Sequence, residues 1–239
     1  MKYYVDYQTR WHDTDAERRV RPSALLVYMQ ETSNRHVADS GMSLDELRDK
    51  KGLAFILSRI RIVFHRPLFA FEDIRVETFT TPSRGYSSTR CFRVLSGETV
   101  IAEADTLWAL VDIKDKRLRT FDEAGYLFED EEPLNINIPS RTRMPADLTP
   151  RAVGERPILY SDLDYNMHMN NTKYPDMLCD YMPIDAVSRI KGMSLSYLRE
   201  AAYGDRIKIE RAEKNGIYYF RTLNSAGEVC LEAAVITEE

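Results

Sequence analysis

The chain has 239 residues, of which 44% are hydrophobic, 30% charged and 10% aromatic. These fractions lie close to the globular average of about 45–50% apolar and about 25% charged residues, which excludes a disordered or low-complexity chain. At roughly 150 residues per domain, the length allows one large domain or two small ones. The formal net charge is −5, from 33 basic and 38 acidic residues, and this sign disfavours a general nucleic-acid binder, which must neutralise phosphates.

The amino-terminal residues and the cysteines predict location and cofactor use. The first 15 residues contain no apolar core of a secretory signal, and no apolar run approaches the roughly 20 residues of a membrane-spanning helix. Cys91, Cys179 and Cys230 are odd in number and far apart, which fits neither a disulfide framework nor a metal-binding spacing. We therefore expect a soluble, reduced, cytoplasmic protein with no cofactor and no nucleic-acid or membrane partner.

In chain order, the first predicted element is a helix that begins near Pro22, because proline is favoured in the first helical turn. Strands are predicted after it at residues 55–64, 73–80 and 99–113, which alternate or are rich in β-branched and aromatic residues. We expect His36 to be a partly exposed helix residue rather than a ligand. The helix face is predicted from residues that recur at helical spacing: Leu25, Tyr28, Met29, Thr32 and His36.

The middle of the chain is rich in proline and predicts a connector. An acidic run at residues 129–132 precedes it. Because proline removes an amide donor and fixes φ, this segment fits an extended linker better than a packed element. We predict a first domain at residues 1–125, a linker at 126–150 and a second domain at 151–239. Five of the ten prolines fall in or beside the linker: Pro133, Pro139, Pro145, Pro150 and Pro157.

The second domain is expected to repeat the order of a helix followed by strands. Asn171 or Thr172 is predicted to cap its helix, and Pro175 is tolerated in the first turn. Strands are predicted at residues 205–212 and 217–223. The fold class is therefore α+β, with a long helix wrapped by an antiparallel sheet in each half. The apolar face of the second helix comprises Tyr174, Met177, Leu178 and Tyr181.

Three pairs of segments indicate a duplicated unit. Asp13 and Asp15 align with Asp162 and Asp164 at an offset of 149 residues. A later stretch aligns at an offset of 133 residues, so the first copy holds 16 additional residues near SLDELRDKKG. The segments CFRVLSGETVIAEA and YFRTLNSAGEVCLEA form the third pair, and three matches in one order argue for duplication. The pairs at the second offset are Ile62 with Leu195, Phe64 with Tyr197, Arg66 with Arg199, and Ile74 with Ile207.

One polar segment of the second copy stands apart from its surroundings. Asp164, Asn166 and His168 are spaced by two residues, so in an extended segment they would point to the same side. They lie just before a predicted helix start, where unpaired amides and the helix dipole can stabilise an oxyanion. A histidine can transfer protons near neutral pH. This combination predicts a catalytic segment.

Two other interpretations of the segment stay open. Asp164 could satisfy the backbone amides of a capping loop in which His168 has no role. Alternatively, Asp162, Asp164 and His168 could bind a metal, although no second His or Cys lies at ligand spacing.

Comparison of the two copies favours catalysis in the second. Where the second copy has Asn166 and His168, the first has Glu17 and Arg19, and Pro67 stands where the second has Glu200. A purely structural loop should not lose three polar groups together in one copy. The comparison suggests one catalytic half and one half given over to binding.

The runs DLDYNMHMNNTKY, residues 162–174, and LSYLREAAYGD, residues 195–205, resemble the acyl-carrier-protein thioesterases of plant plastids and their bacterial relatives. The resemblance extends over nearly the whole chain, including RWHDTDAERRVRP near the amino terminus. It implies a double (tandem) hot-dog fold, in which each sheet wraps one helix. It also implies hydrolysis of the thioester that joins a fatty acyl chain to acyl carrier protein.

Carried over residue by residue, the resemblance implies that Asp164, Asn166 and His168 are the catalytic Asp, Asn and His, and that Glu200 is the catalytic Glu. The family often has a cysteine directly after this glutamate, whereas this chain has Ala201. A cysteine acyl-enzyme route through that position is therefore excluded. Water attack assisted by Glu200 and His168 is the expected mechanism.

Backbone amides at the start of the second helix, near Asn170 and Asn171, are expected to face the oxyanion that forms when water attacks the thioester carbonyl. The resemblance also implies where the acyl chain lies. The acyl chain is expected in the first domain, between helix and sheet. Its predicted lining is Leu25, Met29, Phe55, Leu57 and Trp108.

Acyl carrier protein is acidic, so arginine clusters are candidates for docking it. A homodimer is among the open oligomeric states. The alternatives to the main hypothesis are an acyl-coenzyme A thioesterase of the same fold and a non-catalytic acyl-thioester-binding protein. The clusters are Arg18, Arg19 and Arg21, then Arg59, Arg61 and Arg66, and finally Arg141, Arg143, Arg151 and Arg156.

Overall fold

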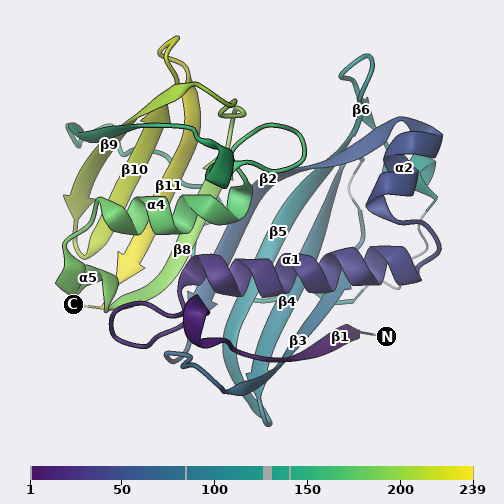
Figure 1. Ribbon diagram of the computed structural model, residues 1–239, viewed down its shortest axis with the longest axis horizontal. Coiled ribbons are helices and arrows are strands. Elements are labelled where there is room, and N and C mark those ends of the chain that lie inside the picture. The colour runs from purple at the N-terminus through teal and green to yellow at the C-terminus, as the bar shows by residue number, and fades with distance from the viewer. Residues whose placement is uncertain (1, 84, 126–130, 140, 239) are drawn as a thin grey trace. The chain divides into compact units, whose positions relative to one another are not determined.

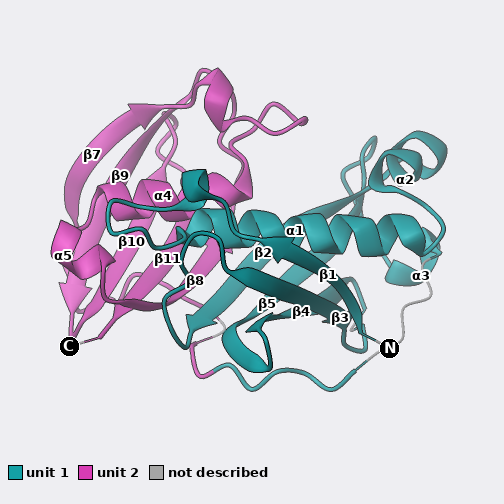
Figure 2. Cartoon of the chain, turned by 60° about the horizontal axis from the view of Figure 1, so that its bottom comes forward, with its two compact units in different colours: residues 1–136 teal, residues 137–239 magenta. Residues whose placement is uncertain are grey.

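The computed structural model describes residues 2–83, 85–125, 131–139 and 141–238. The chain divides into two compact units, residues 1–136 and 137–239 (Figure 2). The segment predicted as a linker, 126–150, is shared between them, and its residues 126–130 and 140 lie outside the described part. No described helix is long and apolar enough to cross a membrane.

Unit 1 is an antiparallel sheet with a long helix, α1, lying along one face (Figure 1). Its strand order is β1-β3-β4-β5-β2, and the short β6 pairs with the end of β5. All the neighbouring strands are antiparallel. The elements are β1 (Tyr3–Gln8), η1 (Trp11–Asp13), α1 (Pro22–Asp39), α2 (Leu44–Lys51), β2 (Leu53–Phe64), β3 (Asp73–Thr80), β4 (Ser87–Ser96), β5 (Thr99–Asp112), β6 (Leu118–Arg119) and α3 (Phe121–Ala124).

Helix α1 begins at Pro22, as predicted, and proline at the first helical position loses no intrahelical hydrogen bond. Leu25, Leu26 and Met29 on its buried face are each at most 3% exposed. Burial of such side chains contributes roughly 1.5–3 kcal/mol each. The apolar spacing therefore fixes which face of α1 is turned away from solvent.

His36 lies half-buried near the end of α1. Its ring stacks on Tyr3 with centroids 4.8 Å apart, and its Nδ1 lies 2.9 Å from Nη1 of the buried Arg90. Because a guanidinium only donates, Nδ1 is the acceptor and the imidazole is neutral. Burial and the charge of Arg90 lower the pKa of His36 to about 4.

The additional residues of the first copy form α2. Ser43 and Glu46 make a reciprocal capping box at its start, and Gly52 ends it in the left-handed conformation with φ of 65°. Leu47, on its inner side, is 1% exposed. It packs in a small core with Leu53, Leu110 and Ala124, against which Met42, Phe55 and Phe121 also pack.

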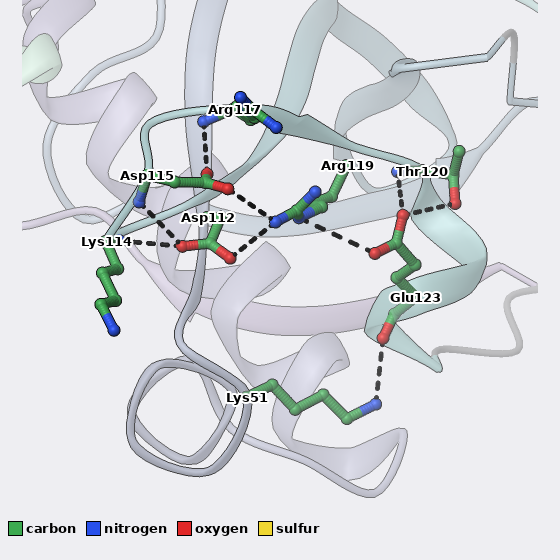
Figure 3. Close-up of polar contacts among 8 residues, drawn as sticks. All are labelled: Lys51, Asp112, Lys114, Asp115, Arg117, Arg119, Thr120 and Glu123. Atoms are coloured by element: carbon green, nitrogen blue, oxygen red, sulfur yellow. Dashed lines mark hydrogen bonds and ion pairs between the residues drawn. The ribbon is translucent and has the colours of Figure 1, made fainter.

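A polar network holds the β5–β6 turn and α3 beside this small core (Figure 3). Arg119 donates to Asp112 and Asp115, each at 3.0 Å, and lies 3.9 Å from Glu123. Lys51, the last residue of α2, donates to the main-chain oxygen of Glu123 at 3.2 Å. The network therefore links α2, β5 and α3.

Unit 2 has the same plan, with α4 lying over an antiparallel sheet (Figure 1). Its strand order is β8-β11-β10-β9-β7. The elements are β7 (Arg151–Pro157), η2 (Tyr160–Asp162), η3 (Asn171–Lys173), α4 (Tyr174–Asp180), α5 (Ile184–Val187), β8 (Ile190–Tyr197), β9 (Arg206–Lys214), β10 (Ile217–Leu223) and β11 (Val229–Thr237).

The prediction of a long helix is wrong for unit 2, since α4 has 7 residues against 18 in α1. Asn171 and Thr172, the predicted caps, lie within η3, the short turn that leads into α4, and the residue that caps η3 is Asn170, whose Oδ1 accepts from the Thr172 amide at 2.9 Å. The helix ends at Asp180 because Pro183 follows shortly, and proline disfavours helical conformation before it. The predicted apolar face is buried at Tyr174, Met177 and Leu178.

Tyr181 lies just beyond the end of α4 and packs against β7. A Cβ atom at Gly154 would lie 2.1 Å from Cε1 of Tyr181, so only glycine leaves room for the ring. The register of β7 shifts between Ala152 and Gly154, as is common where a glycine admits a close neighbour. At the 149-residue offset, unit 1 has Val5 in place of the glycine and Thr32 in place of the tyrosine.

Candidate active site

The polar segment of unit 2 folds as a tight turn, not as the extended row considered above. The Asp164 amide donates to the His168 carbonyl at 2.9 Å, and the Met167 amide donates to the Asp164 carbonyl at 3.1 Å. Met167 has φ of 65°, and Leu163 pairs with Met169 across the base of the turn. The alternating side-chain row therefore does not form.

Asp164 closes the turn with its side chain. Its Oδ1 accepts from the main-chain amides of Asn166 at 2.9 Å and His168 at 3.3 Å. A carboxylate that bonds amides two and four residues onward stabilises a turn of this kind. The capping interpretation is therefore right about Asp164. Asn166 lies at the exposed tip of the turn, and His168 lies half-buried at its end.

His168 and Glu200 are brought together from different parts of unit 2. Nε2 of His168 lies 3.2 Å from Oε2 of Glu200, and the two side chains are 28% and 65% exposed. An imidazole that contacts a carboxylate and remains open to solvent can accept a proton from water and later return it.

Main-chain pairing positions these two side chains. Glu200 follows the end of β8, and the residues after it run beside the turn. The Met169 amide donates to the Ala201 carbonyl at 2.8 Å, and the Tyr203 amide donates to the Met167 carbonyl at 3.0 Å. Two hydrogen bonds of the backbone thus fix the separation between the turn and the glutamate segment.

The amides at the start of the helix are largely committed to protein partners. The Asn170 amide donates to the Asp162 carbonyl at 2.8 Å, and the Lys173 amide to the Asn170 carbonyl at 2.9 Å. Asn170 therefore acts as a cap, and its amide is not available to an oxyanion. This leaves the Asn171 amide as the candidate from the predicted pair.

The metal-site interpretation does not fit the contacts of these residues. The buried Asp162 carboxylate pairs with Arg156 and accepts from the Leu159 amide at 2.9 Å. Asp164 is turned to the amides of its own turn. Throughout the described ranges there is no group of three or more His, Cys, Asp or Glu side chains that could hold a metal.

A cysteine does lie near Glu200, although not at the position that the sequence comparison considered. Sγ of Cys230, on β11, is 4.0 Å from the Glu200 carbonyl oxygen. Cys230 is 1% exposed, and burial raises the pKa of its thiol, so it lacks the thiolate character of a nucleophile. Its carbonyl accepts from the amides of Leu198 and Arg199 at 2.8 and 3.1 Å, and Cys230 thus supports the segment that carries Glu200.

The predicted acyl-lining residues lie on three elements of unit 1. Leu25 and Met29 of α1 and Leu57 of β2 are buried. Trp108 of β5 is opposite Leu57 in the sheet register, and its Nε1 donates to Thr106 at 2.8 Å. The remaining residue, Phe55, packs in the small core of α2 and α3, where its ring stacks on Phe121 at 5.7 Å.

Many of the clustered arginines have partners within the protein. Ion pairs join Arg19 to Glu17, Arg61 to Asp105, Arg66 to Glu72, and Arg156 to Asp162. By contrast, Arg141, Arg143 and Arg151 are exposed. None of these three belongs to an ion pair with another described residue.

The equivalent turn of unit 1 has the same backbone. The Asp15 amide donates to the Arg19 carbonyl at 2.7 Å, and Asp15 Oδ1 accepts from the amides of Glu17 and Arg19 at 2.8 and 2.9 Å. Arg18 has φ of 66°, like Met167. Unit 1 therefore retains the turn without the imidazole and the glutamate.

Comparison with known proteins defines the class to which this fold and turn belong. A family model described as the acyl-ACP thioesterase N-terminal domain matches residues 1–124, and one described as the C-terminal domain matches residues 150–236. The chain belongs to the acyl-ACP thioesterase family.

Among curated relatives, a chloroplastic palmitoyl-acyl carrier protein thioesterase from Arabidopsis thaliana is 25% identical over 224 residues, covering 84% of this chain and 52% of the relative. A chloroplastic dodecanoyl-[acyl-carrier-protein] hydrolase from Umbellularia californica is 23% identical over 217 residues, covering 81% and 55%. The chain thus spans about half the length of these relatives.

Solved structures share the fold. An acyl-ACP thioesterase from Bacteroides thetaiotaomicron superposes with a TM-score of 0.88 at 22% identity, covering 98% of this chain and 97% of that one. The 12:0-ACP thioesterase from Umbellularia californica superposes with a TM-score of 0.87 at 19% identity, covering 99% and 97%. The fold is accordingly of the hot-dog class.

Proposed function

We propose that the protein hydrolyses the thioester between a fatty acyl chain and acyl carrier protein. The observation that carries the proposal is the contact of 3.2 Å between His168 and Glu200, in a chain that belongs to this thioesterase family. The curated relatives described above are named for hydrolysis of acyl groups from acyl carrier protein.

In the proposed mechanism, His168 and Glu200 act as a couple on one water molecule. The couple takes a proton from the water while its oxygen forms a bond to the thioester carbonyl carbon. The carbon–sulfur bond then breaks, and the proton is returned to the departing sulfur, which yields a free fatty acid and a thiol. Asp164 holds the turn, and Asn166 positions water or substrate at its tip. A positioned acid–base group of this kind contributes roughly 10²–10⁴ in rate.

We assign the two halves different roles in a tandem hot-dog arrangement, with a first domain at residues 1–125, a linker at 126–150 and a second domain at 151–239. The repeated turns at Asp15 and Asp164 support the tandem arrangement. The second domain holds the His168–Glu200 couple. The first domain lacks it and takes the acyl chain against the apolar residues of α1, β2 and β5.

Acyl carrier protein is the proposed partner, and the exposed Arg141, Arg143 and Arg151 are its proposed contacts. Charge complementarity of this kind raises the association rate and weakens with added salt. We also propose a cytoplasmic location, which suits the three free cysteines, Cys91, Cys179 and Cys230.

The function is tested by measuring thiol release from carrier-linked acyl chains of varied length and from the same acyl groups on coenzyme A. We expect turnover on the carrier-linked series, and Glu200→Gln should lower kcat by about 10²-fold or more while the protein stays folded. Binding of the carrier-linked acyl chain without thiol release would instead identify a non-catalytic acyl-thioester-binding protein. Faster turnover of the coenzyme A thioesters would favour an acyl-coenzyme A thioesterase of the same fold.

Docking is tested by reversing charge at Arg141 and Arg143. The double change to Glu should lower kcat/KM for carrier-linked substrate by about 10-fold at low salt and leave a small soluble thioester unaffected. The matched control reverses two exposed charges of unit 1, Lys114 and Arg117. Equal losses on both substrates would exclude docking at these arginines.

A further inference from the structure

The end of β8 is tied to the start of the helix segment by a tyrosine. The hydroxyl of Tyr197, the last residue of β8, donates to the Asn171 carbonyl at 3.0 Å. The ring of Tyr174 packs edge-on against the ring of Tyr197, with centroids 5.4 Å apart. The hydrogen bond fixes the position of the Tyr197 hydroxyl, and the contact with Tyr174 fixes the orientation of its ring.

The two segments that this hydrogen bond joins are those that carry the proposed catalytic couple. Glu200 lies three residues beyond Tyr197, and His168 lies three residues before Asn171. The main-chain bonds of Met169 and Tyr203 join the turn to the residues after Glu200. The Tyr197 hydroxyl adds a link to the residues before it, so the glutamate segment is held on both sides.

The corresponding contacts differ between the copies. At the 133-residue offset, Tyr197 aligns with Phe64 of unit 1, so unit 1 has no hydroxyl at this position. Unit 1 instead uses Tyr28 on its helix, which donates to the buried Asp13 at 2.5 Å. The unit 2 residue equivalent to Tyr28 is Met177. Among the described residues, a tyrosine hydroxyl thus bonds the end of strand β8 to the start of η3 in unit 2, and helix α1 to Asp13 in unit 1.

From these contacts we infer that Tyr197 is a positioning residue for thioester hydrolysis, which acts by fixing the loop that carries His168 against the strand end that carries Glu200. The inference rests on the proposed function of that couple. Tyr197 has no part in bond making itself. Its hydroxyl sets the distance and angle between the imidazole and the carboxylate, on which proton transfer depends.

The state of the hydroxyl agrees with this role. Burial, together with the neighbouring Tyr174, keeps the pKa of Tyr197 well above its usual range. The phenol is therefore protonated at neutral pH, and it is a donor to the Asn171 carbonyl.

The test is Tyr197→Phe, which removes the hydroxyl and keeps the ring against Tyr174. We expect kcat on an acyl-carrier-protein substrate to fall by about 10-fold, and KM to change by less than about 2-fold, because geometry in the transition state is lost while substrate binding is not. Tyr7→Phe is the matched control, since it removes a hydroxyl that lies 3.0 Å from Thr32 in unit 1. It should leave kcat unchanged. Thermal unfolding establishes the temperature at which all variants are folded.

A double-mutant cycle separates positioning from a general loss of stability. In the Glu200→Gln background, Tyr197→Phe should lower the residual kcat by less than about 2-fold, because a residue that acts through the couple has nothing left to position. An equal loss in both backgrounds, or full activity of Tyr197→Phe alone, overturns the inference. If Glu200→Gln retains full activity, the proposed couple fails, and if the parent protein releases no thiol from carrier-linked acyl chains, the proposed function fails, so both outcomes are distinguishable from failure of the inference about Tyr197.

Discussion

The turns at Asp15 and Asp164 have nearly the same backbone and very different side chains. Each is closed by an aspartate that accepts from amides two and four residues onward, and each has one residue with φ near 65°. In unit 2 the turn ends in His168 next to Glu200, whereas in unit 1 it ends in Arg19 paired with Glu17. The backbone is therefore a shared scaffold, and the proposed chemistry depends on the side chains placed on it.

The largest effect should come from the position at the end of each turn. His168→Ala removes the imidazole of the couple, and we expect kcat to fall by roughly 10²–10⁴. Arg19→Ala changes the equivalent position of unit 1 and should leave kcat on a small soluble thioester within about 2-fold of the original, since Arg19 pairs with Glu17 and is no part of the proposed couple. Comparable kcat losses in both variants would show that the two halves do not differ in catalytic role.

The aspartates that close the turns should have equal structural and unequal catalytic effects. Asp164→Ala and Asp15→Ala each remove two side-chain hydrogen bonds to amides, so each should lower the free energy of unfolding by about 1–2 kcal/mol. Only Asp164→Ala should also lower kcat, by about 10-fold, because it frees the loop that carries His168. Urea unfolding and thiol release measure the two effects separately. A kcat loss in Asp15→Ala would contradict the division of roles.

The sequence predicts the scaffold better than it predicts the site. The start of α1 follows from Pro22 and the apolar spacing, because helix-start chemistry and burial of one face are local properties. The 149-residue offset of the duplication also recurs in the hydrogen bonds of Asp15 and Asp164. By contrast, the alternating row of polar residues suggests a strand, and the structure has a turn. The reason is that an aspartate side chain competes with strand pairing by bonding the amides that follow it.

Contacts between distant segments explain what the sequence could not show. Tyr197, at the end of β8, reaches Asn171 in η3, and Cys230 lies near the Glu200 carbonyl because β11 pairs with β8, although these strands are far apart in the chain. The mismatch of Phe64 and Tyr197 in the aligned copies was the one available signal for the first of these. The shortness of α4 depends on Pro183, which lies just past the predicted apolar face and could have been taken into account.

Unit 2 has a small residue, Gly154, next to a large one, Tyr181, where unit 1 has Val5 and Thr32. Urea unfolding can test whether the residues of each pair compensate for each other in size. Gly154→Val places side-chain atoms where the Tyr181 ring lies and should lower the free energy of unfolding by about 1–3 kcal/mol, as overpacking does. Tyr181→Thr removes the ring, so the double variant, which copies the Val5 and Thr32 of unit 1, should recover at least half of that loss. Additive losses in urea unfolding would show that the two positions do not compensate each other.

The smallest expected effect concerns His36, which has no histidine equivalent in unit 2, where Asp185 stands at the 149-residue offset. The folded state holds its pKa at about 4, below the unfolded value of 6.5, so the unfolded chain binds more protons between these limits. Stability from this group is thus complete above pH 6.5 and is lost as the pH falls toward 4. Because solvent screens a half-buried ring, we expect a loss of about 1 kcal/mol.

His36→Gln tests this pH dependence, since glutamine keeps an acceptor for Arg90 and does not titrate. The variant should be less stable than the parent protein at pH 7, because it loses the stacking on Tyr3, but its urea midpoint should change less between pH 7 and pH 5. Hydrogen exchange should place the acid-induced loosening of the parent protein at α1 and β1, where His36 and Tyr3 lie, and not in unit 2. If the urea midpoints of the parent protein and His36→Gln depend on pH in the same way, groups other than His36 cause that dependence. The lower stability of unit 1 in acid would then not originate at His36.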